Sequence, residues 1–127
     1  MKICVSSSGQ GENSVVDFRF GRCPYFVIYE TDTKRYESLE NQGVSSPHGA
    51  GVTAAQQVID AKSDAVITGN MGPNAMELLK AAGIKILNMS GGTVKGAINL
   101  YLEGKLKEIN QAAPAHFGIG QGGRRGW

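Results

Sequence analysis

The apolar positions in the first third of the chain fall into three short runs that are typical of β-strands. Residues 2–6 form an apolar run that leads into a serine and glycine loop, which predicts a buried strand. Residues 25–31 are aromatic and β-branched, and both residue types favour strands. Residues 35–41 follow a short turn and alternate loosely between polar and apolar, which indicates a hairpin partner at a sheet edge.

The rest of the apolar pattern alternates between helical and strand periodicity. The helical segments repeat apolar residues every three or four positions, and Pro73 stands where the first turn of a helix favours proline. Gly83 is placed as a helix C-cap, and Gly104 ends the last helix. The elements predicted are a helix from Val52 to about Lys62, a strand over 65–68, a helix from Pro73 to Gly83, a strand over 84–89 and a helix over 93–103.

This order of elements predicts an α/β fold. We expect a three-layer α/β/α domain with a mixed five-stranded sheet, in which an N-terminal hairpin precedes the βα units. Right-handed crossovers make the later strands parallel to the first. The chain of 127 residues suits one domain, which we place at residues 1–109. Residues 110–127 are rich in glycine and carry no apolar periodicity, so we expect a disordered tail.

Several glycine-containing loops should meet at the carboxyl ends of the parallel strands, where open α/β sheets bind ligands. Most of these loops precede helices, whose N-termini offer free N–H groups and a partial positive charge. Together they predict a site for an anion. The alternative is that the glycines only make tight turns between strands and helices. The candidate binding residues are Ser7, Arg19, Arg22, His48, Gly49, Gly51, Asn70, Gly72, Asn74, Gly91, Gly92 and Thr93.

Composition and charge exclude other classes of protein. Apolar residues make up 41% of the chain and charged residues 19%, which is globular composition, and the net charge of +2 does not by itself imply nucleic acid. No apolar run is long enough for a membrane helix, and the N-terminus is not a signal peptide, so we expect a cytoplasmic protein. The acids nearest to strands lie on the outer hairpin, which argues against a two-metal nuclease. Walker and nucleophile-elbow sequences are missing.

The cysteines and one histidine are candidate ligands for a metal. Cys4 lies inside a predicted strand, where a small core residue is expected. Cys23 stands at a loop edge beside Arg22, which could favour its thiolate, and a packed loop residue is the alternative. His48 stands in a glycine loop, either as a ligand or as a solvated side chain. We therefore name Cys23 and His48 as candidate metal ligands.

Four ordered motifs then give a resemblance to a known family. They are Phe20-Gly21-Arg22-Cys23-Pro24-Tyr25-Phe26, His48-Gly49-Ala50-Gly51, Gly69-Asn70-Met71-Gly72-Pro73-Asn74-Ala75 and Gly91-Gly92-Thr93-Val94. In this order they resemble the dinitrogenase iron–molybdenum cofactor biosynthesis family over residues 1–109. The resemblance implies a ribonuclease-H-like fold without nuclease residues. It also implies that the nitrogenase-linked members bind or carry iron–molybdenum cofactor or its precursors. Stand-alone relatives occur in organisms without nitrogenase, and one related protein carries a molybdenum–copper sulfide cluster. The family more usually has a small non-ligating residue at the position of Cys23.

Two functions follow as hypotheses. The first is a non-catalytic carrier or chaperone for an anionic metal–sulfur cluster, either an iron–sulfur cluster or a molybdenum-containing sulfide, held as cargo. Its partners would be proteins that donate or accept that cluster, and it would be a monomer or weak dimer. The second is a regulatory or interaction module that binds a small phosphate-like anion without metal. We do not expect nucleic-acid binding, since two tail arginines and Trp127 are a small footprint.

Overall fold

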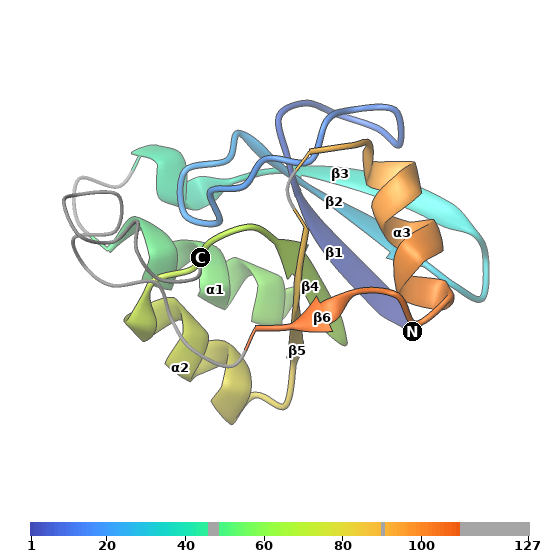
Figure 1. The fold of residues 1–127 in the computed structure, drawn as a ribbon. Helices are drawn as coiled ribbons and strands as arrows, with labels where there is room; N and C mark the ends of the chain where they lie inside the picture. The colour runs from blue at the N-terminus through green and yellow to red at the C-terminus, as the bar shows by residue number, and fades with distance from the viewer. Residues whose placement is uncertain (46–48, 90, 110–127) are drawn as a thin grey trace, which may run out of the picture.

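The computed structural model describes residues 1–45, 49–89 and 91–109, which form a mixed sheet with helices on both faces (Figure 1). The α/β class predicted from the sequence is confirmed. The strands are β1 (Lys2–Ser7), β2 (Tyr25–Glu30), β3 (Arg35–Glu40), β4 (Ala65–Thr68), β5 (Lys85–Asn88) and β6 (Lys107–Glu108). The helices are the 3₁₀ helix η1 (Gln42–Ser45), α1 (Ala50–Asp60), α2 (Pro73–Ala81) and α3 (Val94–Leu102).

The strand order across the sheet is β3-β2-β1-β4-β5-β6. The N-terminal hairpin pairs antiparallel with β1, while β1, β4 and β5 are mutually parallel, as the sequence predicts. Within the described residues the sheet has six strands, so the expectation of five was wrong. The sixth, β6, pairs antiparallel with β5 and contains only Lys107 and Glu108. Two exposed charged residues carry no hydrophobic alternation, which is why the pattern of the sequence gave no sign of this strand.

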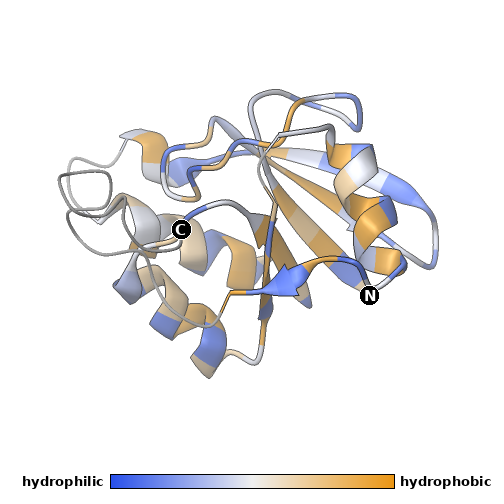
Figure 2. Ribbon diagram, in the orientation of Figure 1, coloured by the Kyte–Doolittle hydropathy of each residue, from blue (hydrophilic) through white to orange (hydrophobic). Residues whose placement is uncertain are grey.

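The hydrophobic core is split between the two faces of the sheet. Side chains alternate along β1, so that Cys4 packs on the face covered by α1 and α2 while Ile3 and Val5 pack on the face covered by α3. The apolar sides of the helices turn toward the strands between them (Figure 2). The strands and helices thus form the layered scaffold that positions the loops at the sheet edge.

The carboxyl ends of β1, β4 and β5 lie at one edge of the sheet, and the segment after β1 runs along that edge. Isolated bridges join Val15 to Thr93 and Arg19 to Asn70, so this one segment contacts the loops before both α3 and α2. It passes very close to Gly69, where an added Cβ would lie 2.5 Å from the Cβ of Phe18. Glycine at position 69 therefore allows this segment to lie against the loop that follows β4.

Candidate functional site

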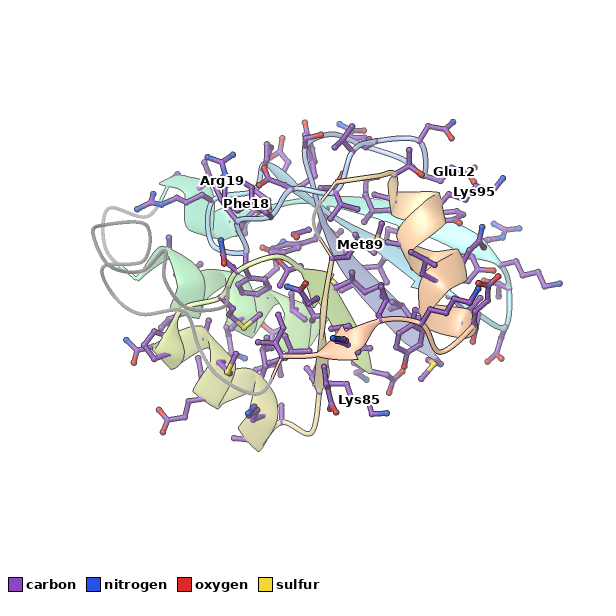
Figure 3. The ribbon with its side chains drawn as sticks, in the orientation of Figure 1. Glu12, Phe18, Arg19, Lys85, Met89 and Lys95 are labelled. Carbon is purple, nitrogen blue, oxygen red and sulfur yellow. The ribbon has the colours of Figure 1, made fainter. Side chains whose placement is uncertain are left out.

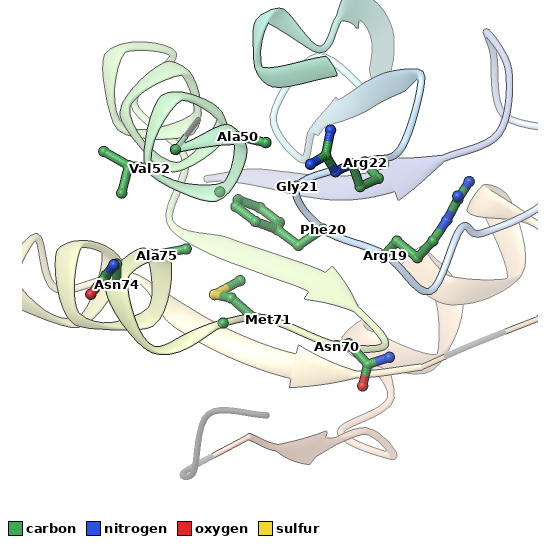
Figure 4. Close-up of a pocket in the computed structure, with 13 residues that line it drawn as sticks. Arg19, Phe20, Gly21, Arg22, Ala50, Val52, Asn70, Met71, Asn74 and Ala75 are labelled. Atoms are coloured by element: carbon green, nitrogen blue, oxygen red, sulfur yellow. The ribbon is translucent and has the colours of Figure 1, made fainter. Parts of the chain in front are cut away.

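A pocket of about 520 Å³ opens at this edge, between the 19–22 segment and the first turns of α1 and α2 (Figure 4). Three segments far apart in the sequence line it. The lining residues are Arg19, Phe20, Gly21, Arg22, Gly49, Ala50, Gly51, Val52, Asn70, Met71, Gly72, Asn74 and Ala75. The pocket therefore brings together seven of the residues predicted from the sequence, namely Arg19, Arg22, Gly49, Gly51, Asn70, Gly72 and Asn74.

Two helices begin at this pocket, and the N-cap residue of each is a glycine, which has no side chain to cap the helix. Gly49 precedes α1 with φ 71° and ψ 29°, in the left-handed region that glycine adopts without strain, and it makes no side-chain cap. Gly72 precedes α2, and Pro73 occupies its first turn, again without a side-chain cap. The first turns of these two helices contain no acidic residue. Both helix ends therefore present uncompensated partial positive charge to the pocket.

The two arginines of the pocket have different surroundings. The guanidinium of Arg19 binds Asp17 through two hydrogen bonds, from Nε to Oδ1 at 3.1 Å and from an Nη to Oδ2 at 3.0 Å. Figure 4 shows the Arg19 side chain extending away from Ala50, Val52 and Ala75. Arg22 is exposed and makes no ion pair within the described residues. Its full charge is available to a ligand.

Asp17 is the acidic residue that pairs with Arg19. Its side chain is only 8% exposed, and burial alone would raise its pKa. The hydrogen bonds from the Arg19 side chain and backbone N–H, together with the Arg19 charge, outweigh burial and lower the pKa of Asp17. Asp17 therefore remains ionised at neutral pH and offsets the charge of Arg19.

The floor of the pocket is apolar. Phe20 is 1% exposed, Met71 is 2% exposed and Ala75 is 2% exposed, and all three belong to the core cluster beneath α1 and α2. Val52 adds a partly exposed apolar side chain at the rim. The pocket thus combines an apolar floor with a positively polarised rim, and no carboxylate lines it in the part of the chain that the structure describes.

The N-terminus of α3 has a different environment. Thr93 caps the helix by accepting a hydrogen bond from the N–H of Gly96 at 3.1 Å. The N–H groups of Val94 and Lys95 donate to the carbonyls of Ser14 and Glu12, both at 2.9 Å. Figure 3 shows Glu12 beside Lys95 at the start of the helix. Gly91, Gly92 and Thr93 do not line the pocket.

Neither cysteine lines the pocket. Cys23 is fully buried, and its Sγ donates to the carbonyl of Phe20 at 3.3 Å. Burial raises the pKa of Cys23 to about 12, and burial also raises the pKa of Cys4 well above its ordinary value. Both are therefore protonated thiols at neutral pH. The geometry of Cys23 corresponds to the packed loop residue rather than to the ligand.

The two other residues predicted at the site lie elsewhere or are not described. Ser7 is buried, and its Oγ donates to the carbonyl of Gly9 at 2.7 Å, so it serves a turn after β1. His48 lies outside the described residues. Within the described ranges, no three of the acidic, cysteine and histidine side chains are grouped to hold a metal ion, and no helix is long and apolar enough to cross a membrane.

Phe20, Asp17 and Asn41 are among the residues near the site that were not named as candidates from the sequence. Phe20 ends the amphipathic stretch 15–20 within the polar, glycine-bearing segment 9–24, and that stretch was the signal that could have indicated its burial. Asp17 stands two residues before Arg19, and this spacing is the one signal that could have pointed to the pair. Asn41 ends the hairpin and contacts the pocket loop from behind, through hydrogen bonds to backbone carbonyls that no sequence pattern reports.

Comparison with known proteins places this arrangement in a class of small α/β domains linked to metal-cofactor assembly. The sequence profile of the dinitrogenase iron–molybdenum cofactor family matches residues 1–104. The chain belongs to this family, so the resemblance noted in the sequence is confirmed. An uncharacterised protein of Methanocaldococcus jannaschii is 33% identical over 101 residues, which are 77% of this chain and 86% of that protein.

Solved structures show the same fold. The apo form of the orange protein from Desulfovibrio gigas matches with a TM-score of 0.84 and 34% identity, over 89% of this chain and 96% of that one. A NifB-like protein from Thermotoga matches with a TM-score of 0.79 and 36% identity, over 90% and 97% of the two chains. The similarity therefore extends across nearly the whole length of both proteins.

Proposed function

We propose that this protein binds an anionic metal–sulfur cluster, or a precursor of one, in the pocket between Arg22 and the first turns of α1 and α2. One observation carries the proposal: two helix N-termini with glycine at the N-cap and an arginine without an ion pair among the described residues meet at one pocket, whose described lining includes no carboxylate. Each of these groups favours negative charge, and together they make an anion site.

The floor of the pocket favours a sulfide-rich anion over an oxyanion. Phe20, Met71 and Ala75 lie at the bottom of the pocket, are 1–2% exposed, and have apolar side chains without a hydrogen-bond donor. An oxyanion placed against them would lose hydration without a partner, which costs free energy. Sulfide is softer and more weakly hydrated than oxide, so it suits contact with a thioether and an aromatic ring.

Family membership supports cargo related to iron–molybdenum cofactor, and the orange protein of Desulfovibrio gigas is described in an apo form. The described residues offer no set of side-chain ligands to a metal, so we propose binding through charge and backbone groups. A cluster held in this way can leave intact. The proposed role is therefore that of a non-catalytic carrier that receives a cluster from one protein and gives it to another.

A second candidate is a phosphate-like anion bound without metal. The same two helix N-termini favour it, because phosphate is a common ligand of such ends. The two candidates differ in what the apolar floor contributes. A phosphate would contact the polar groups of the lining, chiefly the helix ends and Arg22, whereas a thiometalate would also touch the small exposed parts of Met71 and Phe20.

Tetrathiomolybdate and molybdate separate the two candidates, since both are tetrahedral dianions and differ only in sulfur against oxygen. The protein is incubated without oxygen with tetrathiomolybdate, with and without Cu(I), and separately with molybdate, with phosphate, and with iron and sulfide. After desalting, retained metal, phosphate and the visible spectrum are measured. We expect stoichiometric retention of a sulfide-containing species and none of molybdate or phosphate. Retention of the oxyanions alone would establish the second candidate.

The site is tested with Arg22→Gln. Removing the unpaired charge should weaken retention by about tenfold, the effect of one charge-assisted contact. Arg35→Gln is the matched control, because Arg35 is also exposed but lies on edge strand β3, outside the pocket. Equal retention by both variants would place the anion elsewhere. Retention of nothing under any condition would refute the proposed function.

A further inference from the structure

Asn41 lies behind the pocket, outside its lining, and is 5% exposed. Its Nδ2 donates to the carbonyl of Cys23 at 2.8 Å and to that of Gly21 at 3.2 Å, with the carbonyl of Phe20 at 3.5 Å. A single amide thus gathers the backbone carbonyls of one loop, and that loop carries Arg22. Carbonyls drawn together in this way repel one another unless a donor stands between them.

The other half of the same side chain binds the backbone of the next segment, η1. Oδ1 of Asn41 accepts the N–H of Gly43 at 2.8 Å, in the 3₁₀ helix η1. Gly43 packs directly on the carbonyl of Ala50, where a Cβ would clash, so η1 abuts the first residue of α1. Asn41 therefore joins the Arg22 loop to η1 through hydrogen bonds of opposite polarity, and η1 in turn packs against the beginning of α1.

The gap between loop and helix is narrow. A Cβ added to Gly21 would lie 3.1 Å from the backbone nitrogen of Gly51, so the two backbones touch at this point. Gly51 belongs to the first turn of α1, whose N–H groups face the pocket. A small movement of the loop would separate Arg22 from the helix N-terminus and spread the positive groups apart.

We infer that Asn41 is a positioning residue, which holds the 20–23 loop against the beginning of α1 and thereby places Arg22 over the helix N-termini. The expected effect of Asn41 on anion binding rests on the proposed function. The effect of Asn41 on the backbone of the loop does not depend on any ligand. Asn41 itself touches no anion, because other residues line the pocket.

Asn41→Asp is the decisive variant. It keeps the size of the side chain and the acceptor for Gly43, but it replaces the donor with an oxygen that faces three carbonyls. Gln57→Glu is the matched control, since Gln57 also bridges this region with one donated bond, to Glu40 at 2.7 Å, and one accepted bond, from Gln42 at 2.9 Å. Gln57 does not contact the Arg22 loop. Asn41→Ser, which keeps one donor, serves if the aspartate variant does not fold.

The first measurement uses ligand-free protein and amide NMR. We expect signals of Gly21, Arg22 and Gly51 to move in Asn41→Asp and to remain in place in Gln57→Glu. Unchanged signals at these amides in a folded Asn41 variant would overturn the inference, whether or not any anion binds.

The second measurement is a double-mutant cycle on tetrathiomolybdate affinity. In the wild-type background, Asn41→Asp should weaken binding by about fivefold or more. In the Arg22→Gln background, the same change should weaken it by less than about twofold, because the contact of Arg22 with the anion is already lost. A purely structural role would give equal losses in both backgrounds and would overturn the inference. If the wild-type protein binds no anion, the proposed function fails, and the amide comparison still decides whether Asn41 positions the loop.

Discussion

Two arginines line the pocket, and their neighbours give them different roles. Asp17 engages Arg19 through two side-chain hydrogen bonds, and the Arg19 guanidinium also lies 5.9 Å from the centre of the Phe18 ring. This fixes Arg19 at the rim, with its charge offset. Arg22 has neither constraint among the described residues. The residue whose neighbours leave it free is thus the one that can bind a ligand, while its partner arginine holds the loop in shape.

The Asp17–Arg19 pair makes stability depend on pH. The pKa of Asp17 lies below its ordinary value of 3.8, because the hydrogen bonds and charge of Arg19 outweigh the effect of burial. The ionised carboxylate therefore stabilises the folded protein above that value, and the contribution disappears as the pH falls through the folded-state pKa. At pH 7 we expect Asp17→Asn to lower the free energy of unfolding by about 1–2 kcal/mol.

Urea unfolding at pH 7 and at pH 3 checks this prediction. The difference between wild type and Asp17→Asn should narrow at the lower pH, since pH 3 lies below the ordinary pKa of 3.8 and the unfolded wild-type chain then takes up a proton at Asp17. Glu37→Gln, at an exposed position of β3, should show little effect at either pH. A difference that stays constant with pH would mean that the pair contributes packing rather than charge.

For single residues, the sequence predicted the location of the two arginines better than the environment of Cys23. The motif around Phe20 and Arg22 was enough to put both arginines near the glycine loops. For Cys23 it left open a thiolate ligand favoured by Arg22 or a packed loop residue, and the thiol is buried with a pKa of about 12. The direction of a side chain in an irregular loop depends on contacts such as Asn41, which come from a distant segment. Residue order alone does not contain that information.

Among the helices, the decisive difference lies in what covers each N-terminus. α1, α2 and α3 all follow loops with glycine, and the sequence treats them as equivalent anion sites. In the structure, the carbonyls of Glu12 and Ser14 accept hydrogen bonds from the N–H groups at the start of α3. The segment after β1 thus closes one helix end and leaves two open. A long-range contact of this kind has no local signature in the pattern of glycines.

Thr93→Ala separates the capping role from a binding role. Thr93 accepts the N–H of Gly96, and loss of such a cap lowers the free energy of unfolding by about 1 kcal/mol. Because Thr93 does not line the pocket, we expect tetrathiomolybdate retention to stay at the wild-type level. Thermal unfolding and metal analysis after desalting give the two readouts. If Thr93→Ala lost retention of tetrathiomolybdate with unchanged stability, the loop before α3 would be part of the binding site, as the sequence analysis expected.

For the whole molecule, hydrophobic periodicity predicted the parts that the core dictates. The hairpin, the parallel strands and all three α-helices follow from apolar residues that must face one of two core layers. The strand β6 and the helix η1 escaped prediction because backbone hydrogen bonds, not apolar burial, define them. In η1, the N–H of Gly43 also donates to the side chain of Asn41. The strand β6 is defined by its backbone pairing with β5.

Because the pocket joins three segments of the chain, a bound anion should tighten one side of the molecule more than the other. A ligand at one hundred times its dissociation constant stabilises the folded state by about 2.7 kcal/mol. We expect hydrogen exchange to slow most at the first turns of α1 and α2 and in the 19–22 segment. Amides at the start of α3 already donate to carbonyls, so their protection should increase only with global stability. Equal protection at all three helix starts would contradict the pocket as the site, because it would mean that the anion reaches the closed helix end as well.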